Sequence, residues 1–335
     1  MTWTPPTQIL TADPQHGVTT YARHIAEQVR TVFPLTALTD VPAATLSDPD
    51  WLHLHFTDRL WGVDPVGAAD AFERLAAHHR VIVTLHDVPQ PSDGANLDRR
   101  VECYRRVIGA AKGVVCNSRH EAELLHEYTV PGARPAVIPL PVQPLSHGDR
   151  PFELDGAVAI LGFVYPGKGH DRAIDTVRSV DVGEPGDSVA PWVVALGRAS
   201  AGHEGDVAAL SARAAARGVR FETTGYLSDE DLLARARGVS VPVIAHDHVS
   251  ASGSLASWIS AGRRPIVIRN RYMEEMAALR PGTITLVGAD GFAAAVADAY
   301  RHPESTWLDD GVDLSPTSED TVELYLSYWL SVMSA

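Results

Sequence analysis

The stretch AVAILGFVYPGKGHDR, residues 157–172, carries the clearest indication of the fold. It begins with a short apolar run, predicted as the strand Ala157–Phe163, and continues through a turn in which Gly167 and Gly169 bracket Lys168. A helical pattern follows directly. A strand, a glycine-rich turn and a helix in this order are typical of one unit of a parallel α/β sheet.

The same alternation of short apolar runs and helical patterns extends in both directions. The predicted strands are Leu52–Phe56, Val81–His86, Gly113–Asn117, Ala136–Leu140, Ala157–Phe163, Trp192–Leu196, Val219–Thr223, Val239–Ile244 and Pro265–Ile268. The predicted helices are Thr19–Val29, Gly67–His79, Leu97–Ala111, Glu121–Tyr128, Asp171–Val180, Gly205–Arg217, Asp229–Ala236, Leu255–Ala261 and Gly291–His302. Strands that alternate with helices predict parallel sheets covered on both faces.

A proline-rich segment, Ile138–Pro151, interrupts this alternation and predicts a hinge. We therefore expect two Rossmann-like domains that face each other across a cleft, residues 1–145 and 146–312. The remaining residues, 313–335, contain a predicted helix, Ser318–Ser334, with Tyr325 and Trp329 near one face. This helix is too apolar for a free tail, so we expect it to dock, with the N-terminal domain as one candidate surface.

The composition is that of an ordinary globular protein, with 335 residues, 45% hydrophobic and 21% charged. It excludes a disordered, collagenous or coiled-coil chain. The formal net charge of −14 disfavours bulk attraction to nucleic acid or to an anionic membrane, so we expect neither partner. Any bound phosphate would then be held by local geometry.

The N-terminus and the cysteines indicate an intracellular protein. The first ten residues contain two prolines and no basic, apolar leader, and no stretch is long and apolar enough to cross a bilayer. Cys103 and Cys116 are too few for a disulfide scaffold and lack the paired spacing of a metal site. We expect a cytoplasmic protein with both thiols reduced.

Two segments after predicted strands could bind phosphate. The glycines around Lys168 allow close backbone approach, and the lysine adds charge near a helix start, although the P-loop spacing is absent. In Val249–Gly262, Ser252, Gly253 and Ser254 precede a short helix and could present amide groups and hydroxyls. Each segment is also explained as structure alone, the first as an ordinary turn with a solvated lysine and the second as a serine cap.

Three further features suit ligand contact but have structural explanations as well. Gly225-Tyr226-Leu227 precedes Ser228, a predicted N-cap with Asp231 at the reciprocal position, so its aromatic ring could flank a base or simply pack. In the N-terminal half, Gly17 opens a helix and permits close approach of a ligand. His86 ends a strand, where it could meet a substrate hydroxyl or bond a loop carbonyl.

Several histidines and acidic residues invite a metal interpretation that we discount. His53 and His55 alternate on one strand without a third ligand nearby in sequence. His246-Asp247-His248 is equally explained as a polar loop after a strand. Asp48-Pro49-Asp50 is predicted to form a turn. The sequence therefore predicts no metal site.

Taken together, these motifs resemble the GT-B fold glycosyltransferases of family GT4, over most of the chain and most strongly from Gly162 to Val267. The matching segments are His16-Gly17 through Tyr21, the strand end at His86, Asn117-Ser118, Val137-Ile138-Pro139, Gly162 to Gly169, Gly225 to Leu227, and Ser260 to Val267. Two departures are clear. Phe163 stands where the family has a diphosphate-binding arginine. Val249 and Ser257 replace its paired glutamates, and Ser252–Leu255 matches a Ser-Gly-Ser-Leu variant of some relatives.

The resemblance implies an α/β GT-B enzyme with an N-terminal acceptor domain and a C-terminal nucleotide-sugar donor domain. The residues it implies are His86 and Lys168 for catalysis, then Gly162, Phe163, Lys168, Gly197, Arg198, Tyr226, Leu227, Ser252, Gly253, Ser254 and Leu255 for the donor, and His16, Gly17, Tyr21 and Asn117 on the acceptor side. It further implies transfer with retention of configuration, without a required cofactor or metal, from a GDP- or UDP-sugar co-substrate.

The expected reaction moves a hexose to a hydroxyl of a saccharide or small-molecule acceptor, with a slight preference for mannose from GDP-mannose over glucose from a UDP-sugar. Three alternatives remain open. They are a sugar-nucleotide epimerase of the same fold, a non-catalytic nucleotide-sugar-binding homologue, and a solute-binding protein with two α/β lobes. The missing leader disfavours the last of these.

Overall fold

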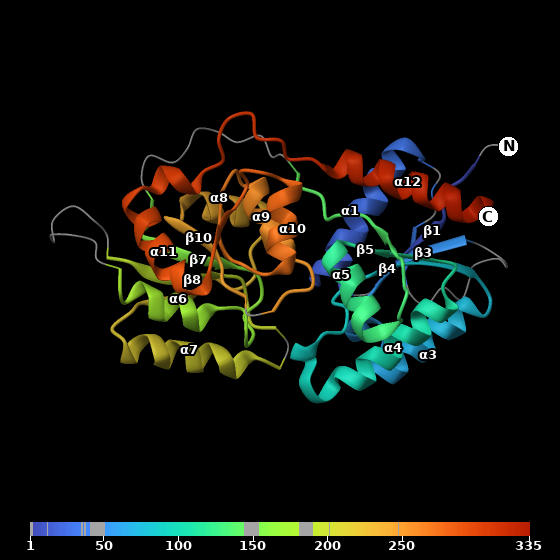
Figure 1. Cartoon of the computed structure of the whole chain (residues 1–335), viewed down its shortest axis with the longest axis horizontal. Helices are drawn as coiled ribbons and strands as arrows, with labels where there is room; N and C mark the ends of the chain where they lie inside the picture. The colour runs from blue at the N-terminus through green and yellow to red at the C-terminus, as the bar shows by residue number, and fades with distance from the viewer. Residues whose placement is uncertain are drawn as a thin grey trace. The chain divides into compact units, whose positions relative to one another are not determined.

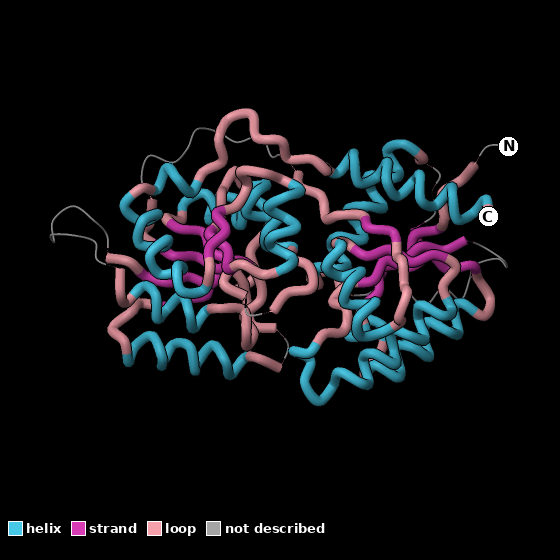
Figure 2. Tube along the Cα trace, viewed as in Figure 1, coloured by secondary structure: helices cyan, strands magenta, loops and turns pink. Residues whose placement is uncertain are grey.

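The computed structural model describes residues 3–11, 13–34, 36, 38–40, 51–143, 154–180, 190–200, 202–246 and 248–335. The chain divides into two compact units. The first unit comprises Met1–Pro141 together with Pro316–Ala335, and the second comprises Val142–Ser315. Each unit contains one parallel sheet with helices on both faces (Figures 1 and 2).

The first sheet has the strand order β2-β1-β3-β4-β5-β6, and all its pairs are parallel. Its strands are β1 (Thr7–Leu10), β2 (Leu38–Asp40), β3 (Trp51–Phe56), β4 (Arg80–Leu85), β5 (Gly113–Cys116) and β6 (Ala136–Val137). The helices of this unit are α1 (Gly17–Val32), α2 (Asp58–Trp61), α3 (Pro65–Ala76), α4 (Leu97–Ala110), α5 (Arg119–Leu124) and α12 (Ser318–Ser334).

Two apolar clusters hold the first sheet between its helices. On one face, Phe72 of α3 and Tyr104 of α4 pack against alternate residues of β3 and β4. On the other face, α1 and α12 pack together, and Tyr325 and Trp329 of α12 are fully buried. The last helix of the chain thus completes the core of the first unit.

The second sheet has the strand order β12-β11-β10-β7-β8-β9 and is also entirely parallel. Its strands are β7 (Ala157–Leu161), β8 (Trp192–Leu196), β9 (Phe221–Thr223), β10 (Val241–Ile244), β11 (Ile266–Ile268) and β12 (Thr285–Val287). Its helices are α6 (His170–Val177), α7 (Glu204–Ala216), α8 (Asp229–Gly238), α9 (Gly253–Ser260), α10 (Arg271–Leu279) and α11 (Phe292–Arg301).

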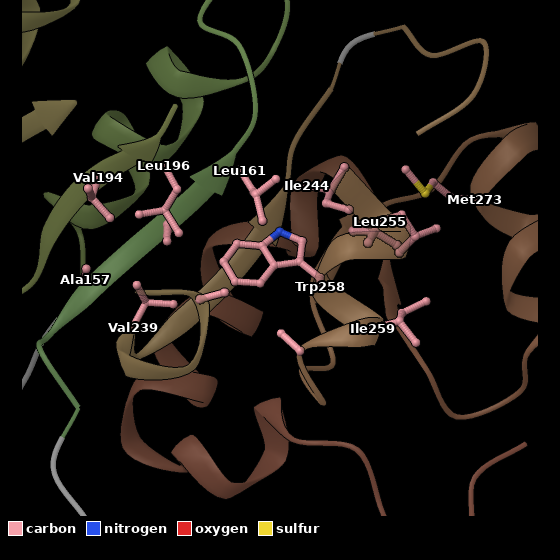
Figure 3. Packing of buried hydrophobic residues seen from close by; sticks show 14 of the residues in the cluster. Ala157, Leu161, Val194, Leu196, Val239, Ile244, Leu255, Trp258, Ile259 and Met273 are labelled. Atoms are coloured by element: carbon pink, nitrogen blue, oxygen red, sulfur yellow. The ribbon is translucent and has the colours of Figure 1, made fainter. Parts of the chain in front are cut away.

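The core of the second unit also lies on both faces of its sheet. Helices α6, α7 and α11 cover one face, and α8, α9 and α10 cover the other. Figure 3 shows Trp258 of α9 packed among Leu161 at the end of β7, Ile244 at the end of β10 and Val239 between α8 and β10. This packing fixes the start of α9 relative to the end of β7.

The two predicted α/β sheets are confirmed, with differences at short elements. The strands β1, β2 and β12 and the helix α2 were not predicted, because runs of three or four residues give little periodicity. The nine-residue helix α10 was also missed. The strand predicted over Ala136–Leu140 ends at Val137, since Pro139 has no N–H for the ladder. The predicted turn at Asp48–Asp50 and part of the hinge segment lie outside the described residues.

Candidate functional site

The strand order of the second sheet locates its ligand-binding edge. The chain runs from β7 outward through β8 to β9, then returns to the other side of β7 with β10 and continues to β12. Ligands of open parallel sheets bind beyond the carboxyl ends of the strands, where this order reverses. The loops that follow β7 and β10 therefore flank the expected site, the first with Lys168 and the second leading through Ser252 into Gly253 and Ser254 at the start of α9.

Glycines allow the loops at this edge to meet. A Cβ on Gly169 would lie 2.3 Å from the carbonyl oxygen of Ala245, and a Cβ on Gly197 would lie 2.1 Å from that of Gly162. Gly169 also has a φ of 93°, in the region that favours glycine, and it caps α6. The loop after β7 is thus held against both neighbouring loops, which brings the predicted Gly162, Lys168 and Gly197 together.

Lys168 is the most unusual charged group in this unit. Its side chain is buried, and its Nζ lies 3.4 Å from the Ser254 hydroxyl and 5.7 Å from the centroid of the Tyr165 ring. Among the described residues it forms no ion pair. Burial lowers the pKa of the Lys168 ammonium to about 7. A buried ammonium without a neutralising partner can bind an anion, which would supply the missing opposite charge.

The start of α9 provides further donors, but fewer than predicted. The Ser252 hydroxyl accepts from the Leu255 amide at 3.2 Å, so Ser252 provides the serine cap that was the structural alternative for this segment, and the helix begins at Gly253 and not at Leu255 as predicted. The Ser252 amide donates to the Tyr272 hydroxyl at 3.1 Å. The Leu255 side chain lies in the core. The Ser254 hydroxyl lies 3.1 Å from the Ser252 hydroxyl and 3.4 Å from the Lys168 Nζ, so the first-turn amides of Gly253 and Ser254 are the donors that the helix start can offer to a ligand.

An arginine lies next to the position where the family has one. The guanidinium carbon of Arg198, in the loop after β8, lies 5.3 Å from the centroid of the Phe163 ring. The Val164 amide donates to the Arg198 carbonyl at 2.8 Å and ties the two loops together. The Nε of Arg198 is buried without a hydrogen-bond partner among the described residues. Phe163 thus supports a guanidinium that comes from the neighbouring loop.

The Gly225–Leu227 turn adjoins the same edge. The Gly225 amide donates to the Gly197 carbonyl at 3.1 Å. Tyr226 is 61% exposed, so its ring is free to contact a ligand, whereas Leu227 packs against the core. Ser228 caps α8 as predicted, and the Asp231 carboxylate accepts from its hydroxyl at 2.7 Å.

Two buried histidines beside Lys168 were not predicted as site residues. His246 follows β10, and His170 begins α6, and neither ring has a hydrogen-bond partner among the described residues. Burial and the neighbouring Lys168 lower the pKa of both imidazoles. The position of His246 at the end of a strand was the available signal. Over the described part of the chain, no three His, Cys, Asp or Glu side chains gather as a metal site would require.

In the first unit the strand order reverses between β1 and β3, so the loop after β1 lies at the expected ligand edge. His16 ends that loop, and its Nδ1 accepts from the Val18 amide at 3.2 Å. A Cβ on Gly17 would meet no atom within 4 Å, which leaves open space at the start of α1. One turn further along α1, the Tyr21 ring packs edge-on against His86, with centroids 5.7 Å apart.

His86 is held by an unusual backbone turn. The next residue, Asp87, has a φ of 49°, the one positive value among the described non-glycine residues. The Tyr104 hydroxyl donates to the His86 carbonyl at 2.6 Å, and the Arg100 guanidinium donates to the Asp87 carbonyl. Burial, with a contribution from His16, lowers the pKa of His86 to about 3. His86 is therefore a neutral imidazole at physiological pH.

Asn117 has a structural role in the same unit. Its side-chain Nδ2 donates to the Ile138 carbonyl at 3.0 Å, and its backbone amide donates to the Glu121 carboxylate at 2.7 Å. These bonds join the end of β5 to the segment that leaves β6. Its buried Oδ1 has no partner among the described residues. The predicted acceptor-side residues His16, Gly17 and Tyr21 lie near the predicted catalytic His86, and the Asn117 side chain also interacts with the Tyr21 hydroxyl.

In the described part of the chain, no helix is both long and apolar enough to cross a bilayer.

Residues 15–144 match the model of the family described as Glycosyltransferase Family 4. The search of curated proteins gives no match. Among solved structures, Anabaena HepE in complex with UDP-glucose aligns with a TM-score of 0.66 and 13% identity over 97% of each chain. The pneumococcal O-GlcNAc transferase GtfA, solved with UDP and GlcNAc, aligns with a TM-score of 0.57 and 12% identity over 85% of this chain and 57% of GtfA.

TarM also aligns, with a TM-score of 0.60 and 11% identity over 85% of this chain. The chain spans only 55% of the length of TarM. At these identities the structural matches establish the fold, and the family match covers residues 15–144. The predicted resemblance is confirmed at the level of the fold and of a family match: this chain has the GT-B fold, and its residues 15–144 match the model of the family-4 glycosyltransferases.

Proposed function

We propose that the protein is a retaining glycosyltransferase that moves a hexose from a UDP-sugar to a hydroxyl of a saccharide or small-molecule acceptor. The observation that carries this proposal is Lys168, a buried ammonium without an ion-pair partner among the described residues, at the carboxyl edge of the second sheet. The family match of the N-terminal unit supports the same class of reaction.

The second unit would bind the donor. Lys168, the Ser254 hydroxyl and the amides at the start of α9 would hold the diphosphate, and Arg198 would supply the charge that Phe163 lacks. The exposed ring of Tyr226 would stack on the base. Negative charge develops on the diphosphate as the bond to the sugar breaks, so fixed donors at this position lower the barrier.

The first unit would bind the acceptor and orient the sugar. His86 is neutral, which suits a hydrogen bond to a hydroxyl and does not suit a permanent positive charge. The space at Gly17 would admit part of the ligand. The leaving diphosphate itself would take the acceptor proton, so this proposal assigns no carboxylate base and requires no metal.

UDP is proposed as the nucleotide because HepE and GtfA were both solved with UDP or a UDP-sugar. The predicted preference for GDP-mannose has no support among the reported structures and stays a competing prediction.

The test is a thermal-shift panel of UDP, GDP, ADP, NAD and the corresponding nucleotide sugars. A ligand that binds only the folded state raises the melting temperature. We expect a shift with UDP and UDP-sugars that exceeds the shift with NAD or ADP. A melting-temperature shift confined to GDP would indicate a GDP-sugar donor in place of the UDP-sugar. No shift with any nucleoside diphosphate would contradict the proposed function.

Product analysis then separates the enzymatic alternatives. Donor alone should remain unchanged apart from slow hydrolysis, and release of UDP should require an acceptor saccharide. An epimerase would convert the donor sugar in the absence of an acceptor. A non-catalytic binding homologue would show a higher melting temperature with the donor but would never release UDP.

A further inference from the structure

A second histidine lies directly behind His86. His55, on β3, places its Nδ1 2.9 Å from the Nε2 of His86, within hydrogen-bond distance. Both side chains are buried, at 4% and 6% exposed. The Tyr21 ring packs edge-on against both imidazoles. The two rings are therefore held in a fixed mutual geometry.

His86 is the one side-chain hydrogen-bond partner of His55 in the described part of the chain. The other ring nitrogen of His55, Nε2, is buried and unpartnered there. The adjacent His53 differs, because its Nδ1 bonds Gln8 and its Nε2 bonds Thr84, both at 2.9 Å. His53 thus has a complete structural role, whereas the hydrogen-bonding capacity of His55 is directed to His86.

Both imidazoles are neutral near pH 7, since burial lowers the pKa of His86 to about 3 and that of His55 well below its ordinary value. Each ring then carries one proton, and the shared bond has two possible directions. If His86 donated, His55 would carry its own proton on the buried, unpartnered Nε2. If His55 donates, that nitrogen carries only a lone pair. Orphaned buried N–H groups are rarer than under-satisfied acceptors.

We infer that His55 is a positioning residue for His86: its Nδ1–H donates to the His86 Nε2 and thereby fixes the His86 proton on Nδ1. His86 then presents an N–H to its ligand. This deepens the proposed function, because an imidazole in this tautomer donates a hydrogen bond to a sugar or acceptor oxygen and does not remove a proton from it.

The direct test is the tautomer of His86 in the ligand-free wild-type protein. Long-range ¹H–¹⁵N correlation spectra of ¹⁵N-histidine-labelled protein at pH 7 report which ring nitrogen is protonated, and the His86 signals are assigned by their loss in His86→Gln. We expect a protonated Nδ1 and a bare Nε2 at His86. A protonated Nε2 would overturn the inference, whether or not the protein is a glycosyltransferase.

Substitutions of His55 test whether this residue sets the tautomer of His86. His55→Leu removes the donor, and His55→Asn keeps an amide near the position of Nδ1. We expect mixed tautomers at His86 in His55→Leu and the wild-type tautomer in His55→Asn. His53→Asn is the matched control on the same strand and should leave the tautomer unchanged. An unaltered tautomer in folded His55→Leu would contradict the role of His55.

Kinetics add a second readout once an acceptor is known. His55→Leu should lower kcat about 10- to 100-fold, the size of effect known for loss of the hydrogen-bond partner that orients a metal-bound histidine. The affinity for UDP, measured by calorimetry, should stay unchanged, and His55→Asn should recover most of the loss. Equal losses in His55→Leu and His53→Asn would indicate only a structural effect and would overturn the positioning role.

Discussion

At the scale of single residues, Lys168 is the side chain on which the proposed chemistry depends most. Its ammonium is buried beside Ser254 and would face the leaving diphosphate. Lys168→Ala should lower kcat about 100-fold, as loss of one oxyanion-type donor typically does. Steady-state release of UDP measures this effect, and an unchanged melting temperature would show that the variant is folded. Wild-type turnover in the variant would remove Lys168 from the mechanism.

The lowered pKa of Lys168 predicts a pH dependence of nucleotide binding. Below about pH 7 the ligand-free protein carries the charged ammonium, and above it the proton is lost and must be regained on binding. The Kd for UDP should therefore rise as the pH increases from 7 to 8.5, approaching about tenfold per pH unit. Calorimetry over this range measures the slope. Lys168→Arg, which does not titrate, should flatten it.

The lowered pKa of Lys168 also makes the free energy of unfolding depend on pH. The unfolded chain keeps the ordinary lysine pKa of 10.5, so between pH 7 and pH 10.5 it binds more protons than the folded, ligand-free protein. The contribution of Lys168 to the free energy of unfolding must therefore increase as the pH rises through this range. Comparing wild type with Lys168→Met isolates this contribution, and the difference between their stabilities should shrink with increasing pH.

At the scale of elements, Arg263 fixes the end of α8 to the start of β10. Its fully buried guanidinium donates to the carbonyls of Ala236, Val239, Ser240 and Thr306. Arg263→Met would leave these acceptors unsatisfied and should lower the free energy of unfolding by about 3 kcal/mol or more. Arg301→Met, at an exposed ion pair with Asp298, should change it by less than about 1 kcal/mol. Denaturant unfolding measures both changes in the free energy of unfolding. Equal changes in Arg263→Met and Arg301→Met would contradict the structural role of Arg263.

At the scale of the whole molecule, α12 returns from the far end of the chain to complete the first unit. Trp329 is fully buried against the first sheet, whereas Leu330 is 46% exposed. Trp329→Ala should cost about 3–5 kcal/mol through the cavity it leaves, and Leu330→Ala should cost little. Hydrogen exchange of β4 and β5 would localise the effect. Unchanged protection there in Trp329→Ala would show that α12 is dispensable.

The sequence by itself determined the two α/β units, most of their strands and helices and the cap at Ser228, and it predicts the loops after strands as the place of the site. These features depend on local periodicity and on residues near one another along the chain. Only the tertiary structure decided that Lys168 is buried beside Ser254, that Arg198 lies over Phe163, and that His55 bonds His86. Each of these contacts joins loops or strands that are distant in sequence. Neighbouring strands of a parallel sheet are connected by long crossovers, so a local sequence pattern does not indicate which strands lie side by side.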